Sequence, residues 1–206
     1  KQFKLISEKD HGIYDAMNKG IRQAKGQLIG IVNSDDWYEP DTVEQVVRAY
    51  QGNEYEVIYG MQRTYLNGKE KATFIYHHDF LPQQMITHPT CFVTRAVYEH
   101  FGVFDLQYKS ASDYDFMLRL YRTGKVTFTP VMRVLSNFRL GQVVRQAYKR
   151  ILKSDTSMDI CLRKHCCFRQ LKVKYISGCM KGKGNVGKKI GYYLFKYRKK
   201  RPKSIL

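Results

Sequence analysis

A helix is predicted over residues 13–25, where apolar residues recur three or four positions apart. These residues are Ile13, Met17, Ile21 and Ala24. Gly26 follows as a natural C-cap. Residues 28–32 are then an apolar run containing Ile and Val, which predicts a buried strand. The early part of the chain is therefore expected to be a helix followed directly by a strand.

Further apolar runs predict an α/β domain. Residues 1–6 and 55–60 are expected to be strands, and residues 62–67 and 71–76 a hairpin around Asn67-Gly68. One helix is expected to begin near Pro40-Asp41 and another at Asp113. The apolar side of the second helix holds Phe116, Met117, Leu120 and Tyr121. At 206 residues the chain can bury a substantial core.

Charge divides the chain at about Leu140-Gly141. Residues 1–140 hold 17 Lys and Arg against 16 Asp and Glu, whereas residues 141–206 hold 19 against 2. The overall net charge of +18 therefore comes almost entirely from the second part. We expect a near-neutral domain over residues 1–140 and a basic helical tail over residues 141–206.

The tail combines apolar stripes at helical spacing with many lysines and arginines. Such a basic amphipathic segment suits an anionic membrane surface, and no run approaches the ~20 apolar residues that span a bilayer. A solvated basic helix or a disordered tail is the alternative. Nucleic acid is a less favoured partner, although charge alone does not separate it from a membrane.

The five cysteines do not predict a zinc site. Cys161, His165, Cys166 and Cys179 lie close in sequence, but they lack the paired C-x-x-C spacing of structural zinc sites. An odd number of cysteines fits free thiols in a reducing compartment.

The candidate chemistry begins where the strand over residues 28–32 ends, at Asn33-Ser34-Asp35-Asp36. In open α/β sheets, ligands bind at the carboxyl ends of strands. Adjacent carboxylates repel each other, and Mg²⁺ is typically held by one or two carboxylates together with substrate phosphates. These residues therefore indicate a metal-diphosphate site. The alternative is a solvated turn in which an Asp caps the next helix.

Two sets of motifs resemble the inverting family 2 glycosyltransferases of the GT-A fold. The run from Ser7 to Ile21, SEKDHGIYDAMNKGI, is similar to the family's segment before the strand that bears its D-x-D metal motif. Asn33-Ser34-Asp35 stands at that motif, with Asn in place of the first acid. The resemblance therefore implies Asp35 as the principal ligand of a divalent metal, Mn²⁺ or Mg²⁺, with Asp36 joining or capping a helix.

The second set lies downstream in the expected order. His88-Pro89-Thr90-Cys91-Phe92, Gly102-Val103-Phe104-Asp105 and the run from Ala111 to Leu120 are similar to the family's H-Q/P-x-x-F, G-x-F-D and D-Y-D-L-x-L-R elements. The resemblance, which covers about residues 5–140, implies Asp113 as the catalytic base. Ser112 stands where the family often has Glu. Read from the residues alone, Asp113 is the N-cap of its helix.

The resemblance also implies substrate contacts. Asp10 and Asn18 match positions that line the nucleotide pocket, and Asn33, Ser34 and His88 are the other candidates for substrate binding. The alternatives are that Asp10 starts a helix, that Asn18 is a solvated helix residue, and that His88 is a satisfied core histidine.

The implied fold is a GT-A nucleotide-diphospho-sugar transferase core, a Rossmann-like mixed sheet, with a basic helical C-terminal extension. The implied reaction moves a sugar from a nucleotide sugar, UDP-linked by preference, to a glycan or lipid-linked acceptor. We expect the protein to act in the synthesis of cell-surface polysaccharide or lipopolysaccharide, at the cytoplasmic, inner face of the membrane.

Family members begin with a βαβ unit that is not found here. We therefore expect at least ~30 residues to be missing, in a truncated product or a segment of a longer enzyme. An inactive truncated relative, or a basic module that binds nucleic acid or membrane, are the alternative functions.

Overall fold

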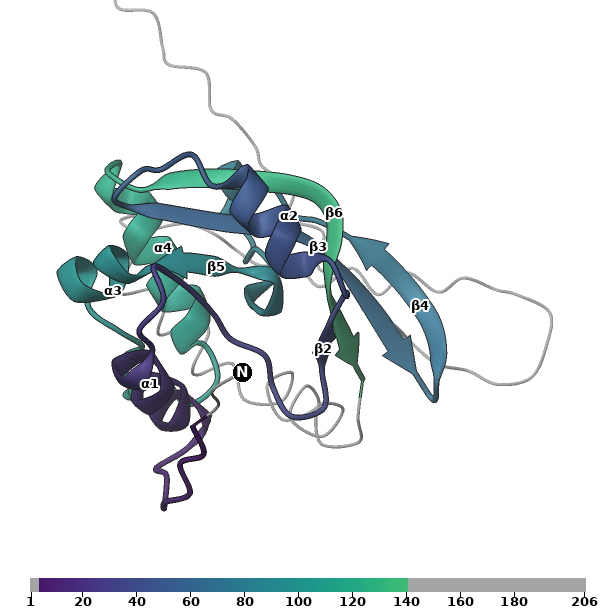
Figure 1. The fold of residues 1–206 in the computed structure, drawn as a ribbon, viewed down its shortest axis with the longest axis horizontal. Coiled ribbons are helices and arrows are strands. Elements are labelled where there is room, and N and C mark those ends of the chain that lie inside the picture. Colours follow the sequence, from purple (N-terminus) through teal and green to yellow (C-terminus); the bar gives the residue numbers. More distant parts are fainter. Residues whose placement is uncertain (1–3, 141–206) are drawn as a thin grey trace, which may run out of the picture. The chain divides into compact units, whose positions relative to one another are not determined.

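The computed structural model describes residues 4–140; residues 1–3 and 141–206 lie outside the described range. Four helices, six strands and two short 3-10 helices, η1 and η2, make up the described part (Figure 1). In chain order they are α1 (Ile13–Gln23), β1 (Leu28–Gly30), β2 (Trp37–Tyr38), α2 (Thr42–Ala49), β3 (Glu56–Leu66), β4 (Lys69–Phe74), η1 (His78–Phe80), η2 (His88–Thr90), β5 (Phe92–Thr94), α3 (Arg95–Phe101), α4 (Ser112–Thr123) and β6 (Thr127–Arg139).

The strands form one mixed sheet in the order β1-β5-β3-β6-β2, with β4 paired to β3. β3 and β6 are parallel, and the other pairs are antiparallel. β3 pairs with β5 near its start and with β4 towards its end, while β6 runs along most of its length. β3 is therefore the central strand of the sheet.

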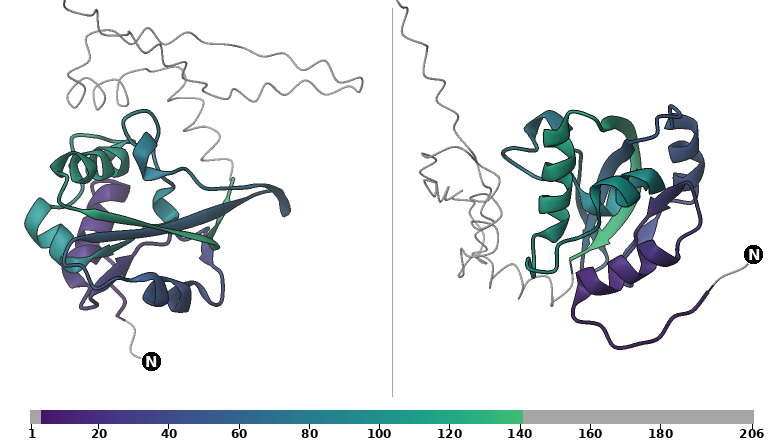
Figure 2. Two further views of the ribbon diagram at one scale, coloured as in Figure 1. Left: turned by 90° about the horizontal axis from the view of Figure 1, so that it is seen from above. Right: turned by 90° about the vertical axis from the view of Figure 1, so that its left-hand side faces the viewer.

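Each face of the sheet is covered by its own helices, as Figure 2 shows for α2 and α4. Side chains of β3 alternate between the two faces, as strand geometry requires. Val57 and Tyr59 join the larger core with α1, α3 and α4. Ile58 joins the smaller core, where Val46 of α2 meets Leu135 of β6.

Gly60 allows the central strands to pack closely against a side chain. A Cβ at this position would lie 2.6 Å from Cγ of Leu135 and 2.9 Å from the backbone oxygen of Arg133. The pairing of β3 with β6 also shifts register on either side of Met61. The register shift of the central strand pair thus lies next to a residue without a side chain.

Most predicted elements are confirmed, with shifted ends. The helix over residues 13–25 is α1, but its C-cap is Ala24 and not Gly26, because the Ala24 N–H already bonds to the carbonyls of Gly20 and Ile21. The hairpin forms around Asn67-Gly68, and its first strand is the continuation of β3. The strand predicted over residues 1–6 is wrong for residues 4–6, which pair with no other strand, and Leu5 is exposed.

No helix in residues 4–140 has the length and apolar character needed to cross a bilayer. The predicted basic tail lies outside the described residues.

Candidate active site

Asp113 lies in the first turn of α4 and faces the N-terminal helix. The hydroxyl of Tyr14, on α1, donates a hydrogen bond of 2.8 Å to Asp113 Oδ1, which also accepts from the backbone N–H of Tyr114 at 3.0 Å. Asp113 Oδ2 receives no hydrogen bond from any residue in the range 4–140. One oxygen is therefore held in place while the other is available to a ligand.

Tyr14 is a candidate site residue that the sequence reasoning did not single out. It is buried, and burial together with the Asp113 charge raises its pKa far above the usual range, so its hydroxyl stays protonated and acts as a donor. The available signal was a tyrosine hydroxyl on the apolar side of α1, within the motif that precedes the first strand.

Asn18 holds the turn that leads towards α4. Its side-chain amide donates to the carbonyl of Phe104 at 2.9 Å and accepts from the Phe104 N–H at 3.0 Å. Only 3% of Asn18 is exposed, so the alternative of a solvated helix residue is wrong. A direct contact between Asn18 and nucleotide stays a prediction.

Arg119 fastens the same turn from the other side. Its guanidinium pairs with Asp115 at 2.9 Å and donates to the carbonyls of Phe101 and Val103 at 2.8 and 2.9 Å. Gly102 lies between these carbonyls with a φ of 81°, which suits glycine. Arg119, the last residue of the D-Y-D-x-x-x-R pattern, therefore stabilises the segment that carries Phe104.

His88 is buried against the same aromatic ring. Its imidazole packs edge-on against Phe104, with ring centroids 5.4 Å apart, and Tyr14 contacts Phe104 at 5.6 Å. Burial lowers the pKa of His88, and the nearby Asp113 charge only partly opposes this. His88 is therefore a neutral core histidine beside Asp113, and its contact with substrate stays a prediction.

The Asn33–Asp36 turn is far more open. The Asp36 N–H donates to the carbonyl of Asn33 at 3.1 Å, and Ser34 and Asp35 are exposed at the tip. Asp36 is half-buried and accepts from the Arg139 N–H at 3.0 Å and the Asn33 amide at 3.3 Å. Burial raises the pKa of Asp36, and the Asp35 charge adds to this. A cation would offset the cost of ionising this pair.

Asp10 lies in an acidic group around one lysine. Lys19 Nζ contacts Asp10 Oδ1 at 2.9 Å, Glu8 Oε1 at 3.0 Å and Asp15 Oδ2 at 3.4 Å. These ion pairs tie residues 8–10 to α1. Asp10 does not start the helix, which begins at Ile13 after Gly12.

The capping alternatives for Asp113 and Asp36 are both wrong. The N-cap of α4 is Ala111, and Asp113 bonds to its neighbour's N–H and not to the N–H groups that a cap satisfies. The N-cap of α2 is Asp41, and Asp36 bonds to the end of β6 instead.

Apart from Asp10, which pairs with Lys19, the predicted residues form two groups. Asn18, His88 and Asp113 lie around Phe104 and Tyr14. The residues of the Asn33–Asp36 turn are tied to the end of β6. No hydrogen bond or ion pair within residues 4–140 joins the two groups.

Within residues 4–140, no further His, Cys, Asp or Glu side chain completes a metal site at the turn. In the described part of the chain, the one group of three His, Cys, Asp or Glu side chains close enough to share an ion is His77, His78 and Asp79, in another loop. Asp35 and Asp36 supply carboxylate oxygens, the donors that Mg²⁺ and Mn²⁺ prefer, but the remaining ligands must come from phosphate or water.

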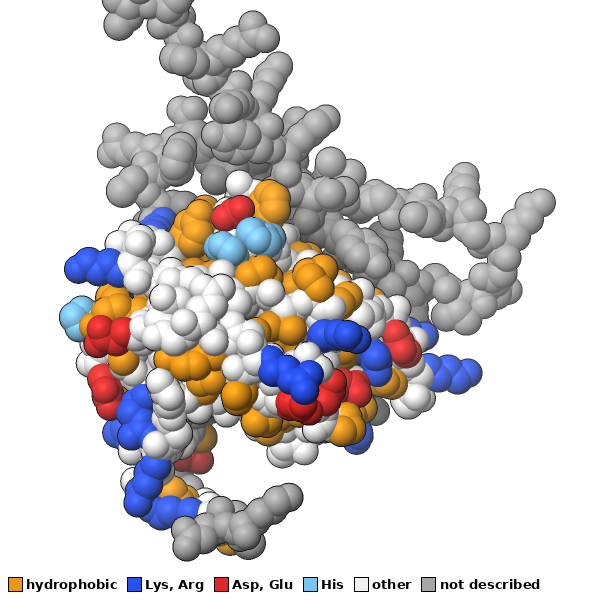
Figure 3. Space-filling model, turned by 45° about the horizontal axis from the view of Figure 1, so that its top comes forward, with side chains coloured by type: hydrophobic (Ala, Val, Ile, Leu, Met, Phe, Trp, Pro, Cys, Tyr) orange, Lys and Arg blue, Asp and Glu red, His pale blue; other side chains and the backbone are white. Residues whose placement is uncertain are grey.

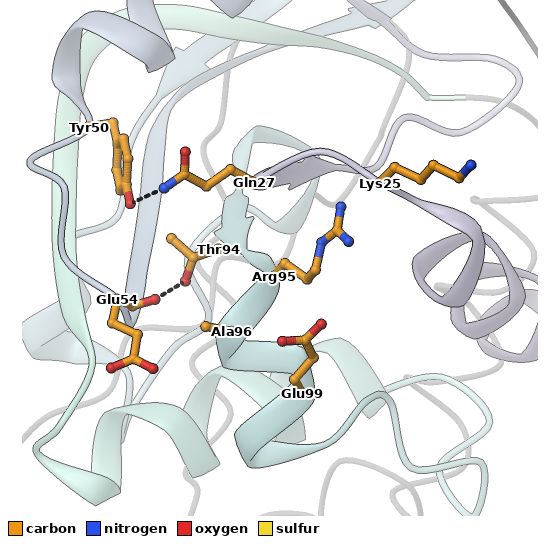
Figure 4. Close-up of a pocket in the computed structure, with 8 residues that line it drawn as sticks. All are labelled: Lys25, Gln27, Tyr50, Glu54, Thr94, Arg95, Ala96 and Glu99. Carbon is orange, nitrogen blue, oxygen red and sulfur yellow. Dashed lines mark hydrogen bonds between the residues drawn. The ribbon is translucent and has the colours of Figure 1, made fainter.

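A cavity of about 390 Å³ lies at the opposite end of β1, near Gln27 (Figure 4). Two of its polar side chains bond to protein: the Gln27 amide donates to the Tyr50 hydroxyl, and Arg95 donates to the Gly26 carbonyl. None of the predicted site residues lines this cavity. It therefore lies outside the candidate active site.

The sequence model described as "Glycosyl transferase family 2" matches residues 1–126. The chain belongs to glycosyl transferase family 2. The family prediction made from the motifs is therefore confirmed.

Two mycobacterial proteins are among the relatives of this family 2 chain. An uncharacterized glycosyltransferase of Mycobacterium tuberculosis is 32% identical over 119 residues, covering 55% of this chain and 45% of that protein. A PGL/p-HBAD biosynthesis glycosyltransferase of Mycobacterium bovis is 31% identical over 117 residues, covering 54% and 44%. The chain thus spans about half the length of these relatives.

Solved structures confirm the predicted GT-A core. TarS 1–349 of S. aureus in complex with UDP-GlcNAc has a TM-score of 0.53 at 15% identity, covering 76% of this chain and 51% of that one. Another crystal structure of S. aureus TarS 1–349 has a TM-score of 0.51 at 17% identity, covering 73% of this chain and 48% of that one. At these identities the likeness concerns the fold alone.

Proposed function

We propose that this family 2 chain transfers a sugar, with inversion, from a nucleotide diphosphate sugar to an acceptor hydroxyl. The observation that carries the proposal is the state of Asp113: Oδ1 is held by Tyr14 and the Tyr114 N–H, and Oδ2 is unoccupied by any residue of the described range. A general base needs one such oriented oxygen within reach of the proton that it removes.

In the proposed reaction the acceptor oxygen attacks the anomeric carbon while the bond from that carbon to the diphosphate oxygen breaks. Asp113 Oδ2 takes the acceptor proton, and the nucleoside diphosphate leaves on the opposite side. A single displacement assisted by a single base inverts the anomeric centre. Tyr14 keeps the carboxylate oriented and transfers no proton, because its own pKa is raised by burial and by Asp113.

We propose Asp35 as the principal ligand of a divalent metal, with Asp36 assisting directly or through water. The raised pKa of Asp36 supports this, because a nearby cation stabilises the ionised carboxylate. When bound, Mn²⁺ or Mg²⁺ would neutralise charge on the departing diphosphate. Asn33 and Ser34, on the same turn, are the proposed contacts to donor oxygens.

We propose a UDP-sugar as donor, with Asp10, Asn18 and His88 on the nucleotide or diphosphate side. TarS, which shares the fold, has been solved with UDP-GlcNAc and with UDP. Asn18 has both amide groups engaged by Phe104, so we propose that it acts by positioning that turn.

Calorimetric titration with UDP tests the donor site. We expect UDP to bind in the presence of Mn²⁺ and to bind at least about tenfold more weakly without it, or after Asp35→Ala. Asp41→Ala, which removes another exposed carboxylate at the start of α2, should bind like the unchanged chain. A folded chain that shows no response to UDP would overturn the donor site and favour the inactive relative.

Product analysis tests the chemistry. The chain would be incubated with a panel of UDP-sugars and acceptor glycans, and the new linkage assigned by NMR. A product with the anomeric configuration opposite to that of the donor is expected. Retention of configuration would rule out the single displacement at Asp113.

For the whole protein we propose a glycan or lipid-linked acceptor in cell-surface polysaccharide or lipopolysaccharide synthesis, at the cytoplasmic face of the membrane. The support is the basic composition of residues 141–206, which suits anionic headgroups. Sedimentation with phosphatidylglycerol vesicles, compared with phosphatidylcholine vesicles, tests it. Binding to duplex DNA with equal affinity would favour the basic-module alternative.

A further inference from the structure

The loop between β4 and η2 carries three adjacent side chains that can share a metal ion. His77, His78 and Asp79 each offer one ligand atom, and these atoms lie within 4.8 Å of one another. Figure 3 shows two adjoining histidines and a carboxylate at the surface of the molecule. The side chains of His77 and Asp79 are 46% and 67% exposed, so an ion can reach them from solvent.

The spacing of these atoms fits a tetrahedral first-row metal. His77 Nδ1 lies 3.2 Å from Asp79 Oδ2, and His78 Nε2 lies 3.7 Å from Asp79 Oδ1. Zinc bonds of ~2.0–2.2 Å at tetrahedral angles place neighbouring ligand atoms roughly 3.3–3.5 Å apart. His77 Nδ1 also accepts a long hydrogen bond of 3.4 Å from the Asp79 N–H, which a bound metal would replace. Rotation of the exposed His77 and Asp79 side chains would bring the three ligand atoms to these separations.

His78 is already oriented for such a role. Its Nδ1 lies 2.8 Å from the hydroxyl of Tyr59, a fully buried residue of β3, and its ring stacks on Phe128 of β6 at 5.3 Å. A metal-bound histidine usually has its second ring nitrogen held by such a partner. The Tyr59 hydroxyl also accepts from the His78 backbone N–H at 3.1 Å. In the tautomer that carries its proton on Nδ1, the Nε2 lone pair of His78 is left for a metal.

We propose that His77, His78 and Asp79 form a site for a divalent first-row transition metal such as Zn²⁺, with water in the fourth position. Two imidazoles and a carboxylate favour such ions, whereas Mg²⁺ prefers oxygen ligands alone. The site is separate from Asp113 in its bonding: within residues 4–140, no hydrogen bond or ion pair joins Asp113 to His77, His78 or Asp79. The proposal stands without the proposed glycosyl transfer.

Zn²⁺ titration of the full chain against a chromophoric chelator tests the site. Cysteines outside the described residues can also bind zinc, so all proteins would carry Ser at four positions. These positions are Cys161, Cys166, Cys167 and Cys179. We expect one Zn²⁺ to bind and to raise the Tm. His77→Asn, a change at an exposed side chain, should weaken binding at least tenfold and remove the rise in Tm.

Two further variants distinguish this site from zinc binding elsewhere on the protein. Tyr59→Phe should weaken Zn²⁺ binding by roughly 10–100-fold through loss of the partner of His78. His100→Asn, at an exposed histidine elsewhere, should bind Zn²⁺ like the parent chain. Absence of Zn²⁺ binding, or equal binding by His77→Asn, would overturn the proposal. Equal loss with His100→Asn would show nonspecific histidine binding and would also overturn it.

Discussion

The surroundings of Asp113 and the Asn33–Asp36 turn are built in opposite ways. Around Asp113, the side chains of Tyr14 and Asn18 are buried, and hydrogen bonds join α1 and α4 to each other and to the Phe104 turn. At the Asn33–Asp36 turn, Ser34 and Asp35 are exposed and the bonds are few. The difference teaches that the proposed base is positioned by the fold itself, whereas the proposed metal turn needs its ligands to complete it.

The largest effect is expected from Asp113→Asn. General-base catalysis contributes about 10²–10⁴-fold, so kcat should fall by a factor in that range. The amide still accepts hydrogen bonds from Tyr14 and the Tyr114 N–H, so the fold should persist. Transfer from a UDP-sugar and UDP binding would be measured together. A variant with normal kcat would remove Asp113 from the mechanism.

Two asparagines provide a direct comparison of the regions. Asn18→Ala leaves the buried N–H and C=O of Phe104 without their side-chain partners, which should cost about 2–4 kcal/mol in the free energy of unfolding. Asn33→Ala removes one long bond at the surface and should cost at most about 0.5 kcal/mol. Urea unfolding measures both. Similar costs for the two variants would contradict the contrast between the regions.

The buried side should also be the source of sensitivity to acid. Burial lowers the pKa of His88 in the folded state, whereas the unfolded histidine titrates near 6.5. Below that pH the unfolded chain binds more protons, so stability falls with decreasing pH, by up to about 1.4 kcal/mol per pH unit. His78, whose pKa is lowered mainly by burial, acts in the same direction.

Urea unfolding between pH 7.5 and 5.5 would show this loss. His88→Gln should reduce the slope of the free energy of unfolding against pH, and the contribution of His78 to that slope should remain. An unchanged slope in that variant would place the acid sensitivity elsewhere.

The smallest effect on catalysis is expected from Tyr14→Phe. The ring still packs against Phe104, and only the hydrogen bond to Asp113 is lost, which is worth about 1 kcal/mol. We expect kcat to fall about fivefold while UDP binding is unchanged. A change confined to KM would show that Tyr14 contacts substrate and does not orient the base.

The sequence predicted the elements and the family better than the geometry of the site. Periodicity located α1 and β1, and motif order pointed to family 2, because both depend on residues close together in the chain. Three contacts of the site join distant segments or satisfy backbone groups. They are the bonds between Tyr14 and Asp113, between Asn18 and Phe104, and from Arg119 to the backbone carbonyls. Neither periodicity nor spacing reports such contacts.

The errors have local physical causes. Gly26 was expected to end α1, but the helical bonds already end at Ala24. Asp113 was open to interpretation as a cap because residue type alone does not reveal which N–H a carboxylate accepts from.

The bond between Tyr14 and Asp113 spans 99 positions of the chain, and that between Asn18 and Phe104 spans 86. Contacts of such long range form slowly, because a large loop must close before they are made. During synthesis, α1 therefore leaves the ribosome long before its partners exist. The hydrogen bond that orients the proposed base therefore forms only after α4 has been synthesised.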